Sequence, residues 1–126
     1  MELTKGHLYH VFNQGNNRQK IFFNPDNYLF FLEKIRKHIL PYADVLAWCL
    51  MPNHFHLMIL VKEEEIDITE THRVTPSHPV SKKRTLNNSI AILLRSYTRA
   101  INKQNKTQDL YFEKVPNQNA SHVTGE

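Results

Sequence analysis

The chain has 126 residues, of which 40% are hydrophobic and 22% are charged. This length suits one domain and is short for two, and the composition excludes a disordered or collagen-like protein. No stretch approaches the roughly 18 apolar residues of a membrane span, and the first residues lack the apolar core of a signal peptide, so we expect a cytoplasmic protein. A single cysteine, Cys49, excludes an intramolecular disulfide and a Cys-x-x-Cys pair.

The positive charge is concentrated in the second part of the chain. Residues 1–71 contain seven basic and nine acidic residues, whereas residues 72–126 contain nine basic and three acidic ones, and the formal net charge is +4. A local excess of basic groups attracts polyanions, which makes nucleic acid a candidate partner. The same charge would also serve as a solubilising surface.

The first predicted elements are a strand and a helix. The β-branched and aromatic residues 8–12 predict a strand, which ends at the turn-forming residues 13–17. Asn24 and Pro25 are typical of a helix start, and apolar residues then recur every three or four positions until Pro41.

Two more strands and a second helix follow. Residues 42–51 and 54–62 are apolar runs separated by two residues, which predicts two antiparallel strands, and Trp48 is expected to be buried. Residues 63–84 are polar and aperiodic, which predicts a long mobile loop. Thr85 can cap the last helix. The apolar stripe of that helix comprises Leu86, Ile90, Leu93, Leu94, Tyr97 and Ile101.

The predicted order is strand, helix, strand, strand, helix, within one domain of residues 1–114. An α+β fold satisfies this order, with a ferredoxin-like antiparallel sheet and both helices packed on one face. Its last strand would be missing or donated elsewhere, because residues 115–126 are polar and aperiodic and are expected to form a disordered tail.

A His-x-His pair lies in the third predicted strand. Because side chains alternate along a strand, His54 and His56 point to the same face, roughly 6 to 7 Å apart along the backbone, and Phe55 points to the other. One metal ion could bind both imidazoles. They could equally be surface residues without a ligand, and a small zinc-binding structural domain is a further alternative, with Cys49 one strand away.

Four segments of the chain are together similar to the HUH single-tyrosine transposases, in particular to their REP-associated branch. Over roughly residues 7–113, these segments are Tyr9-His-Val-Phe-Asn-Gln-Gly15, Ile21-Phe-Phe-Asn-Pro25, Leu46-Ala-Trp-Cys-Leu-Met-Pro-Asn-His-Phe-His-Leu-Met58 and Ser96-Tyr-Thr-Arg-Ala-Ile-Asn102. The most specific among them is Met-Pro-Asn-His-hydrophobic-His.

The resemblance implies an activity, a cofactor and a substrate. His54 and His56 would bind a divalent cation, Mg²⁺ or Mn²⁺, that polarises a phosphate of single-stranded or hairpin DNA. A tyrosine would attack that phosphate and form a 5′-phosphotyrosine link, which allows cleavage and rejoining during DNA transposition. A metal ion and a tyrosinate nucleophile suit this chemistry.

The nucleophile departs from the pattern of this family. The REP-associated branch has a Tyr-x-x-x-Asn-Pro motif after the segment that matches residues 111–114, and no such motif follows here, so we expect a C-terminally truncated copy. Tyr97 is the fallback candidate, although its place on the apolar stripe favours a core residue.

The resemblance also suggests DNA contacts and partners. The candidate DNA-binding residues are Asn13, Arg18, Lys20, Arg95, Arg99 and Lys103. Each could instead be an ordinary solvated side chain. Insertion-sequence relatives work as dimers, so a homodimer is expected as one form. The alternatives to an active transposase are an inactive remnant that only binds DNA and a small metal-binding structural domain.

Overall fold

The structure is a computed structural model that describes residues 3–68 and 82–113, and residues 122–125 by their backbone. In chain order its elements are β1 (Leu8–Gln14), the 3-10 turn η1 (Asn16–Arg18), α1 (Pro25–His38), β2 (Ala43–Met51), β3 (His54–Val61), β4 (Glu65–Ile68), β5 (Lys82–Thr85), α2 (Leu86–Asn105) and β6 (His122–Gly125).

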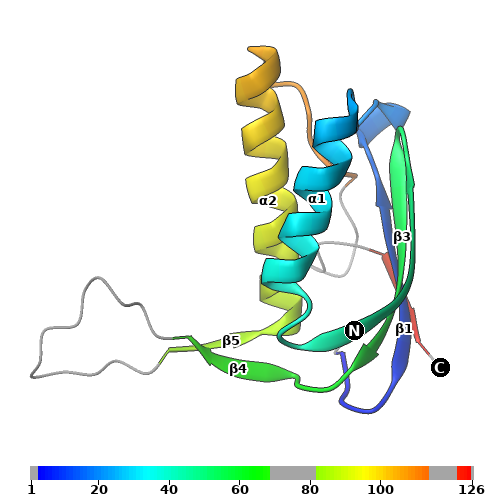
Figure 1. The fold of residues 1–126 in the computed structure, drawn as a ribbon, viewed down its shortest axis with the longest axis vertical. Helices are drawn as coiled ribbons and strands as arrows, with labels where there is room; N and C mark the ends of the chain where they lie inside the picture. Colours follow the sequence, from blue (N-terminus) through cyan, green and yellow to red (C-terminus); the bar gives the residue numbers. More distant parts are fainter. Residues whose placement is uncertain (1–2, 69–81, 114–121, 126) are drawn as a thin grey trace, which may run out of the picture.

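The main sheet has four strands in the order β2-β3-β1-β6, and every neighbouring pair is antiparallel. Both helices cover the same face of this sheet (Figure 1). The order and the two helices form the ferredoxin-like arrangement, which confirms the predicted α+β class. In this arrangement β1 and β3 lie at the centre, so the sequence around the histidine pair forms part of the central strand pair.

Both helices begin as the sequence predicts. The side chain of Asn24 accepts a hydrogen bond from the Asn27 amide, and Pro25 occupies the first helical position of α1. The side chain of Thr85 accepts from the Asn88 amide at the start of α2. Each cap satisfies an amide that the helix itself leaves unpaired.

The prediction of one irregular loop over residues 63–84 is wrong at both ends. β4 and β5 pair as an antiparallel hairpin, which places Asp67 opposite Lys83 and Ile66 opposite Arg84. Opposite charges across a strand pair are favourable, and the side chain of Ile66 packs against the core. The polar composition therefore concealed a short charged hairpin. The connecting residues 69–81 lie outside the described part of the chain.

The expectation of a missing last strand and of a disordered tail is also wrong where the tail is described. β6 pairs with β1, with Val123 opposite Val11. It has four residues, too few for a periodic pattern to stand out, and its pairing joins segments more than a hundred positions apart in the chain. The other tail residues lie outside the described part.

The core between helices and sheet is rich in aromatic rings. Phe31 of α1 lies 5.1 Å from the rings of both Phe55 of β3 and Tyr97 of α2, measured between centroids. Phe22, which precedes α1, lies 5.3 Å from Phe31. Phe31 therefore joins both helices to the central strand.

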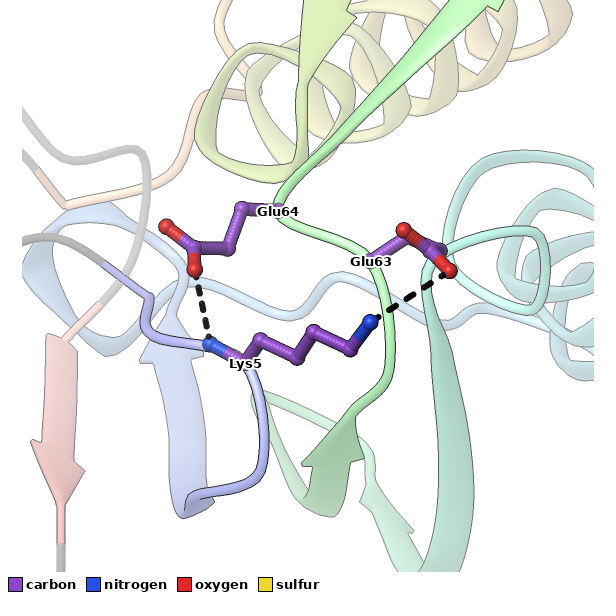
Figure 2. A network of polar contacts seen from close by, with 3 residues as sticks. All are labelled: Lys5, Glu63 and Glu64. Carbon is purple, nitrogen blue, oxygen red and sulfur yellow. Dashed lines mark hydrogen bonds and ion pairs between the residues drawn. The ribbon is translucent and has the colours of Figure 1, made fainter.

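The N-terminal segment forms hydrogen bonds and an ion pair with the end of β3 and the residues that follow it. The ammonium group of Lys5 lies 3.9 Å from a carboxylate oxygen of Glu63, and its backbone amide donates to the Glu64 carboxylate at 3.2 Å (Figure 2). The amide of Gly6 also donates to the Val61 carbonyl. Because the ion pair and the Lys5–Glu64 hydrogen bond are both exposed, the backbone bond between Gly6 and Val61 contributes more to this attachment.

Substituting Phe31 with alanine should destabilise the protein by about 3 to 5 kcal/mol, because it leaves a cavity where both helices meet the sheet. The free energy of unfolding measured in urea is the test. Leu29→Ala, on the same helix and 60% exposed, is the matched control and should change stability by less than about 0.5 kcal/mol. Equal effects of the two substitutions would contradict this packing.

Candidate functional site

One face of the main sheet is left uncovered by the helices, and we call it the open face. Along β1 and β3, buried residues alternate with partly exposed or exposed ones. The residues of the two strands on the open face are Leu8, His10, Phe12, Gln14, His54, His56, Met58 and Leu60. The predicted common orientation of His54 and His56 is therefore present, and Phe55 is buried against the helices.

His54 is oriented by the residue that precedes it. Its Nδ1 lies 2.7 Å from the side-chain oxygen of Asn53. An amide oxygen can only accept a hydrogen bond, so Nδ1 carries the hydrogen and the lone pair is on Nε2. The turn between β2 and β3 thus presents Nε2 of His54 as the nitrogen that is able to bind a metal ion.

His56 is paired with a histidine to which the sequence assigned no role. Nε2 of His10 lies 2.7 Å from Nδ1 of His56, and the two rings are stacked at 4.9 Å. If His56 donates this bond, its Nε2 also keeps a lone pair. Burial, and then the charges of His10 and His54, lower the pKa of His56, which favours the neutral imidazole that metal binding requires.

His10 was missed because its partner comes from another strand. Sequence spacing gives it no neighbour comparable to the His-x-His pair. In the register of β1 and β3, Phe12 is opposite His56, which places His10 diagonally across from it. The alternation of side chains along β1 shows which face His10 occupies. It identifies His10 as a neighbour of His56 only when the pairing of β1 with β3 is known.

A hollow of about 390 Å³ lies beside the two histidines. Its lining comprises Phe12, Asn13, Gln14, His54, Phe55, His56 and Glu113. Glu113 is attached to the end of β1, since its amide donates to the Gln14 carbonyl and its carboxylate accepts from the Gln14 side chain. The wall of the hollow therefore contains carboxylate and amide oxygens as well as imidazoles.

Two imidazoles, those of His54 and His56, would be too few to enclose a divalent metal ion by themselves. The rings of His54 and His56 are 5.1 Å apart and nearly perpendicular. Within residues 3–68 and 82–113, no three His, Cys, Asp or Glu side chains come together as a metal-binding group. Water or a ligand oxygen would have to complete the coordination of Mg²⁺ or Mn²⁺, and such an open position is what a substrate-binding metal needs.

Tyr97 lies in the core and not at the hollow. It is fully buried, and its hydroxyl donates to the Ile21 carbonyl at 2.7 Å. Burial raises the pKa of this phenol well above its usual value, which opposes formation of tyrosinate. Its side chain is on the helix side of the sheet, whereas His54 is on the open face. A nucleophile at this position would have no access to a phosphate, and the core interpretation is the one that the structure shows.

The expectation that Asn13 contacts DNA does not fit its position in the structure. It is 2% exposed, and its side-chain amide donates to the Glu113 carbonyl at 3.3 Å. The alternation of β1 turns this residue toward the helix side. Asn13 therefore fixes the segment that carries Glu113, and is too buried to form a DNA-contacting surface.

Arg18 and Lys20 are exposed at the end of the sheet where His54 begins β3. The chain turns sharply there, and the turn requires glycine at position 15, because a Cβ atom at that position would lie 2.1 Å from the Gln19 carbonyl oxygen. The amide of Gly15 donates to the Asn53 carbonyl. Both residues therefore belong to the turn that contacts the start of β3, and Lys20 lines a separate hollow with Phe22 and Tyr28.

Arg95, Arg99 and Lys103 form an exposed row on α2, which we call the basic stripe. Arg95 is two positions from buried Leu93 and Tyr97, so it points about 200° away from them around the helix. The stripe borders a hollow of about 430 Å³. Because the core direction of α2 is toward the sheet, the stripe faces away from it and lies on the opposite side of the molecule from the histidines.

Comparison with known proteins does not assign the chain to a family. No family model and no curated protein matches the chain. In the described residues, no helix is both long enough and apolar enough to cross a membrane. The assignment of a function therefore depends on the site itself and on the sequence resemblance.

In the metal-free protein at neutral pH, we expect His54 and His56 to carry their hydrogen on Nδ1. Two-dimensional NMR of ¹⁵N-labelled histidine rings distinguishes the tautomers. Asn53→Ala removes the acceptor that holds the hydrogen of His54, so His54 should then populate both tautomers while His56 does not change. His10→Phe should affect His56 alone. A wild-type His54 with its hydrogen on Nε2 would contradict the orientation described above.

Proposed function

We propose that this chain is a transposase-like protein that binds single-stranded or hairpin DNA on its open face, in the cytoplasm. A divalent ion, Mg²⁺ or Mn²⁺, would be held by His54 and His56. The observation that supports this proposal best is the pair of histidines beside one hollow, with Asn53 and His10 at their Nδ1 atoms.

Each part of the open face has a role in this binding. Nε2 of His54 and of His56 hold the ion, and the ion supplies charge neutralisation and orientation for a DNA phosphate. Phe12, whose ring lies 5.8 Å from that of His56, offers an aromatic surface on which a base can stack. Arg18 and Lys20 would contact neighbouring phosphates, which position the strand without reading its sequence.

Cleavage and rejoining of the DNA would need a nucleophile that the described residues do not place at the hollow. Tyr97 is buried, and Tyr111 is 47% exposed with its hydroxyl hydrogen-bonded to the Asn16 side chain. We therefore propose binding without cleavage as the principal activity, and an active strand transferase as the alternative. In that alternative, Tyr111 is the more accessible of these two nucleophiles.

A zinc-binding structural domain is a second alternative with one observation in its favour. Cys49 is exposed and lies directly opposite His56 in the register of β2 and β3, so both are on the open face. Thiolate and imidazole are the ligands that zinc prefers. Tight stoichiometric zinc in the purified protein, without affinity for DNA, would favour this alternative.

A hairpin oligonucleotide with a single-stranded flank should bind more tightly in Mn²⁺ than in a chelator. Because both imidazoles hold the ion, His54→Ala and His56→Ala should each weaken binding in Mn²⁺ by about tenfold or more and leave metal-free binding unchanged. Fluorescence anisotropy measures the affinity. His7→Ala, an exposed histidine outside the hollow, is the control.

The same incubations separate binding from cleavage. Denaturing electrophoresis should show no covalent protein–DNA product. A covalent product that disappears in Tyr111→Phe would establish the active alternative and would leave the metal site as proposed. Binding that is indifferent to metal and to both histidines would contradict the site.

The basic stripe is proposed to bind a second segment of the same DNA by phosphate contacts alone. Arg99→Gln should therefore weaken binding of every DNA sequence to a similar extent, and should reduce the slope of log affinity against log salt concentration by about one. Anisotropy at several salt concentrations tests this expectation. Arg36→Gln, an equal change of charge on the exposed side of α1, should leave the slope unchanged. Equal slopes for both variants would show that the stripe contacts no DNA.

A further inference from the structure

His38, in the last turn of α1, is a buried histidine that the candidate site does not use. It is 6% exposed, and its backbone carbonyl accepts a hydrogen bond from the Ser89 hydroxyl of α2 at 2.6 Å. Within residues 3–68 and 82–113, its imidazole ring forms no hydrogen bond and no ion pair. A neutral ring suits such a place, whereas a charged imidazolium would lack the acceptors that a buried charge needs.

The charged groups that act on this ring are all cations. Lys34 is one turn before His38 on the same side of α1, and Lys37 directly precedes it. Arg84 acts on the ring from β5. Among the described residues, none of these three cations forms an ion pair with a carboxylate. A positive charge on His38 would therefore be the fourth in this cluster, and the other three would repel it.

The other elements around His38 supply no compensating charge. Residues 86–94 of α2 contain no ionisable side chain. Tyr42, which follows α1, is uncharged at neutral pH, since burial raises the pKa of its phenol. The carboxylate of Glu65 in β4 acts on Tyr42 and is not among the groups that act on His38. No anion of the described residues is therefore in place to stabilise a charged His38 ring.

Two hydrogen bonds hold the start of α2 and the hairpin of β4 and β5 against the end of α1. The Ser89 hydroxyl donates to the His38 carbonyl, and the Tyr42 hydroxyl donates to the Arg84 carbonyl at 3.1 Å. Figure 1 shows the hairpin extending away from the main sheet at the end of the molecule where α1 ends and α2 begins. We call this junction of His38, Tyr42, Arg84 and Ser89 the corner.

We propose that the corner is an acid-sensitive switch, in which protonation of His38 separates the hairpin and the first turn of α2 from the end of α1. Lys34, Lys37 and Arg84 repel the new charge, and an opened corner exposes the ring to water, which solvates that charge. The aromatic cluster around Phe31 stays packed, because no ring contact among the described residues joins it to His38. The inference concerns the corner alone and does not depend on the DNA-binding proposal.

The direction of the pH dependence follows from the two forms of the corner. Burial, and then the charges of Lys34, Lys37 and Arg84, lower the pKa of His38 from its usual 6.5 to about 4 in the closed corner. In the open corner the ring is solvated and its pKa returns to the usual value. Between these values the open form binds a proton that the closed form does not, so the closed form loses stability as the pH falls from 6.5 to about 4. Above pH 6.5 the ring is neutral in both forms, and the corner stays closed.

Hydrogen exchange of the full chain, corrected for the intrinsic effect of pH on exchange, measures this opening. The amides of residues 84–90 should open roughly thirtyfold more often at about pH 5 than at about pH 7.5, which is the ratio expected from the two pKa values of His38. The amides on either side of Phe31 should be protected equally at both pH values.

Two pairs of variants assign the effect to His38 and its cations. His38→Leu removes the titrating group and should abolish the acid effect, whereas His7→Leu, at an exposed histidine outside the corner, should retain it. Arg84→Gln removes one of the repelling charges and should reduce the acid effect. Lys83→Gln removes the same charge from the preceding, exposed residue of β5 and should retain the effect. The second pair gives the comparison even where His38→Leu fails to fold.

Several results would overturn the inference. They are equal exchange of the corner at both pH values, an acid effect that persists in His38→Leu, and equal acid effects in Arg84→Gln and Lys83→Gln. Loss of protection throughout the chain at the lower pH would equally overturn it, because the opening would then be global.

Discussion

The burial of one face of the central strand pair is the constraint on which the rest of this structure depends. β1 and β3 place Tyr9, Val11, Phe55, Leu57 and Ile59 under the two helices. Because side chains alternate along a strand, the residues between them are then directed to the opposite face. The histidines reach the open face for this reason, and a register shift of one residue would bury them in an aromatic core.

The same packing separates the chemical groups of the molecule. Tyr97 completes the aromatic cluster with Phe31, which removes its hydroxyl from any substrate and directs the other side of α2 outward. The basic stripe and the histidine hollow are consequently on opposite sides of the protein. Of the cations suggested by the sequence, Arg18 and Lys20 lie in the segment after β1, whose Gly15 amide donates a hydrogen bond to the Asn53 carbonyl beside His54.

Two surfaces of the main sheet remain accessible, and they differ in character. The open face beside His54 and His56 is polar and aromatic, with carboxylate and amide oxygens at its margin. Residues 45–51 of β2 carry no charge, whereas the smaller sheet of β4 and β5 has charged strands.

The sequence by itself determined the local structure and the histidine pair. Asn24, Pro25 and Thr85 specify the starts of the helices through contacts within four residues, and the alternation around Phe55 specifies which residues of β3 face the core. Only the tertiary structure decided which residues join His54 and His56. His10, Glu113 and β6 reach this sheet by pairing between segments far apart in the chain, and short strands leave no periodic signal from which such pairing can be inferred. Trp48 illustrates the same limit, since the expectation that it is buried is wrong, and its exposure follows from the place of β2 in the strand order and not from the residue itself.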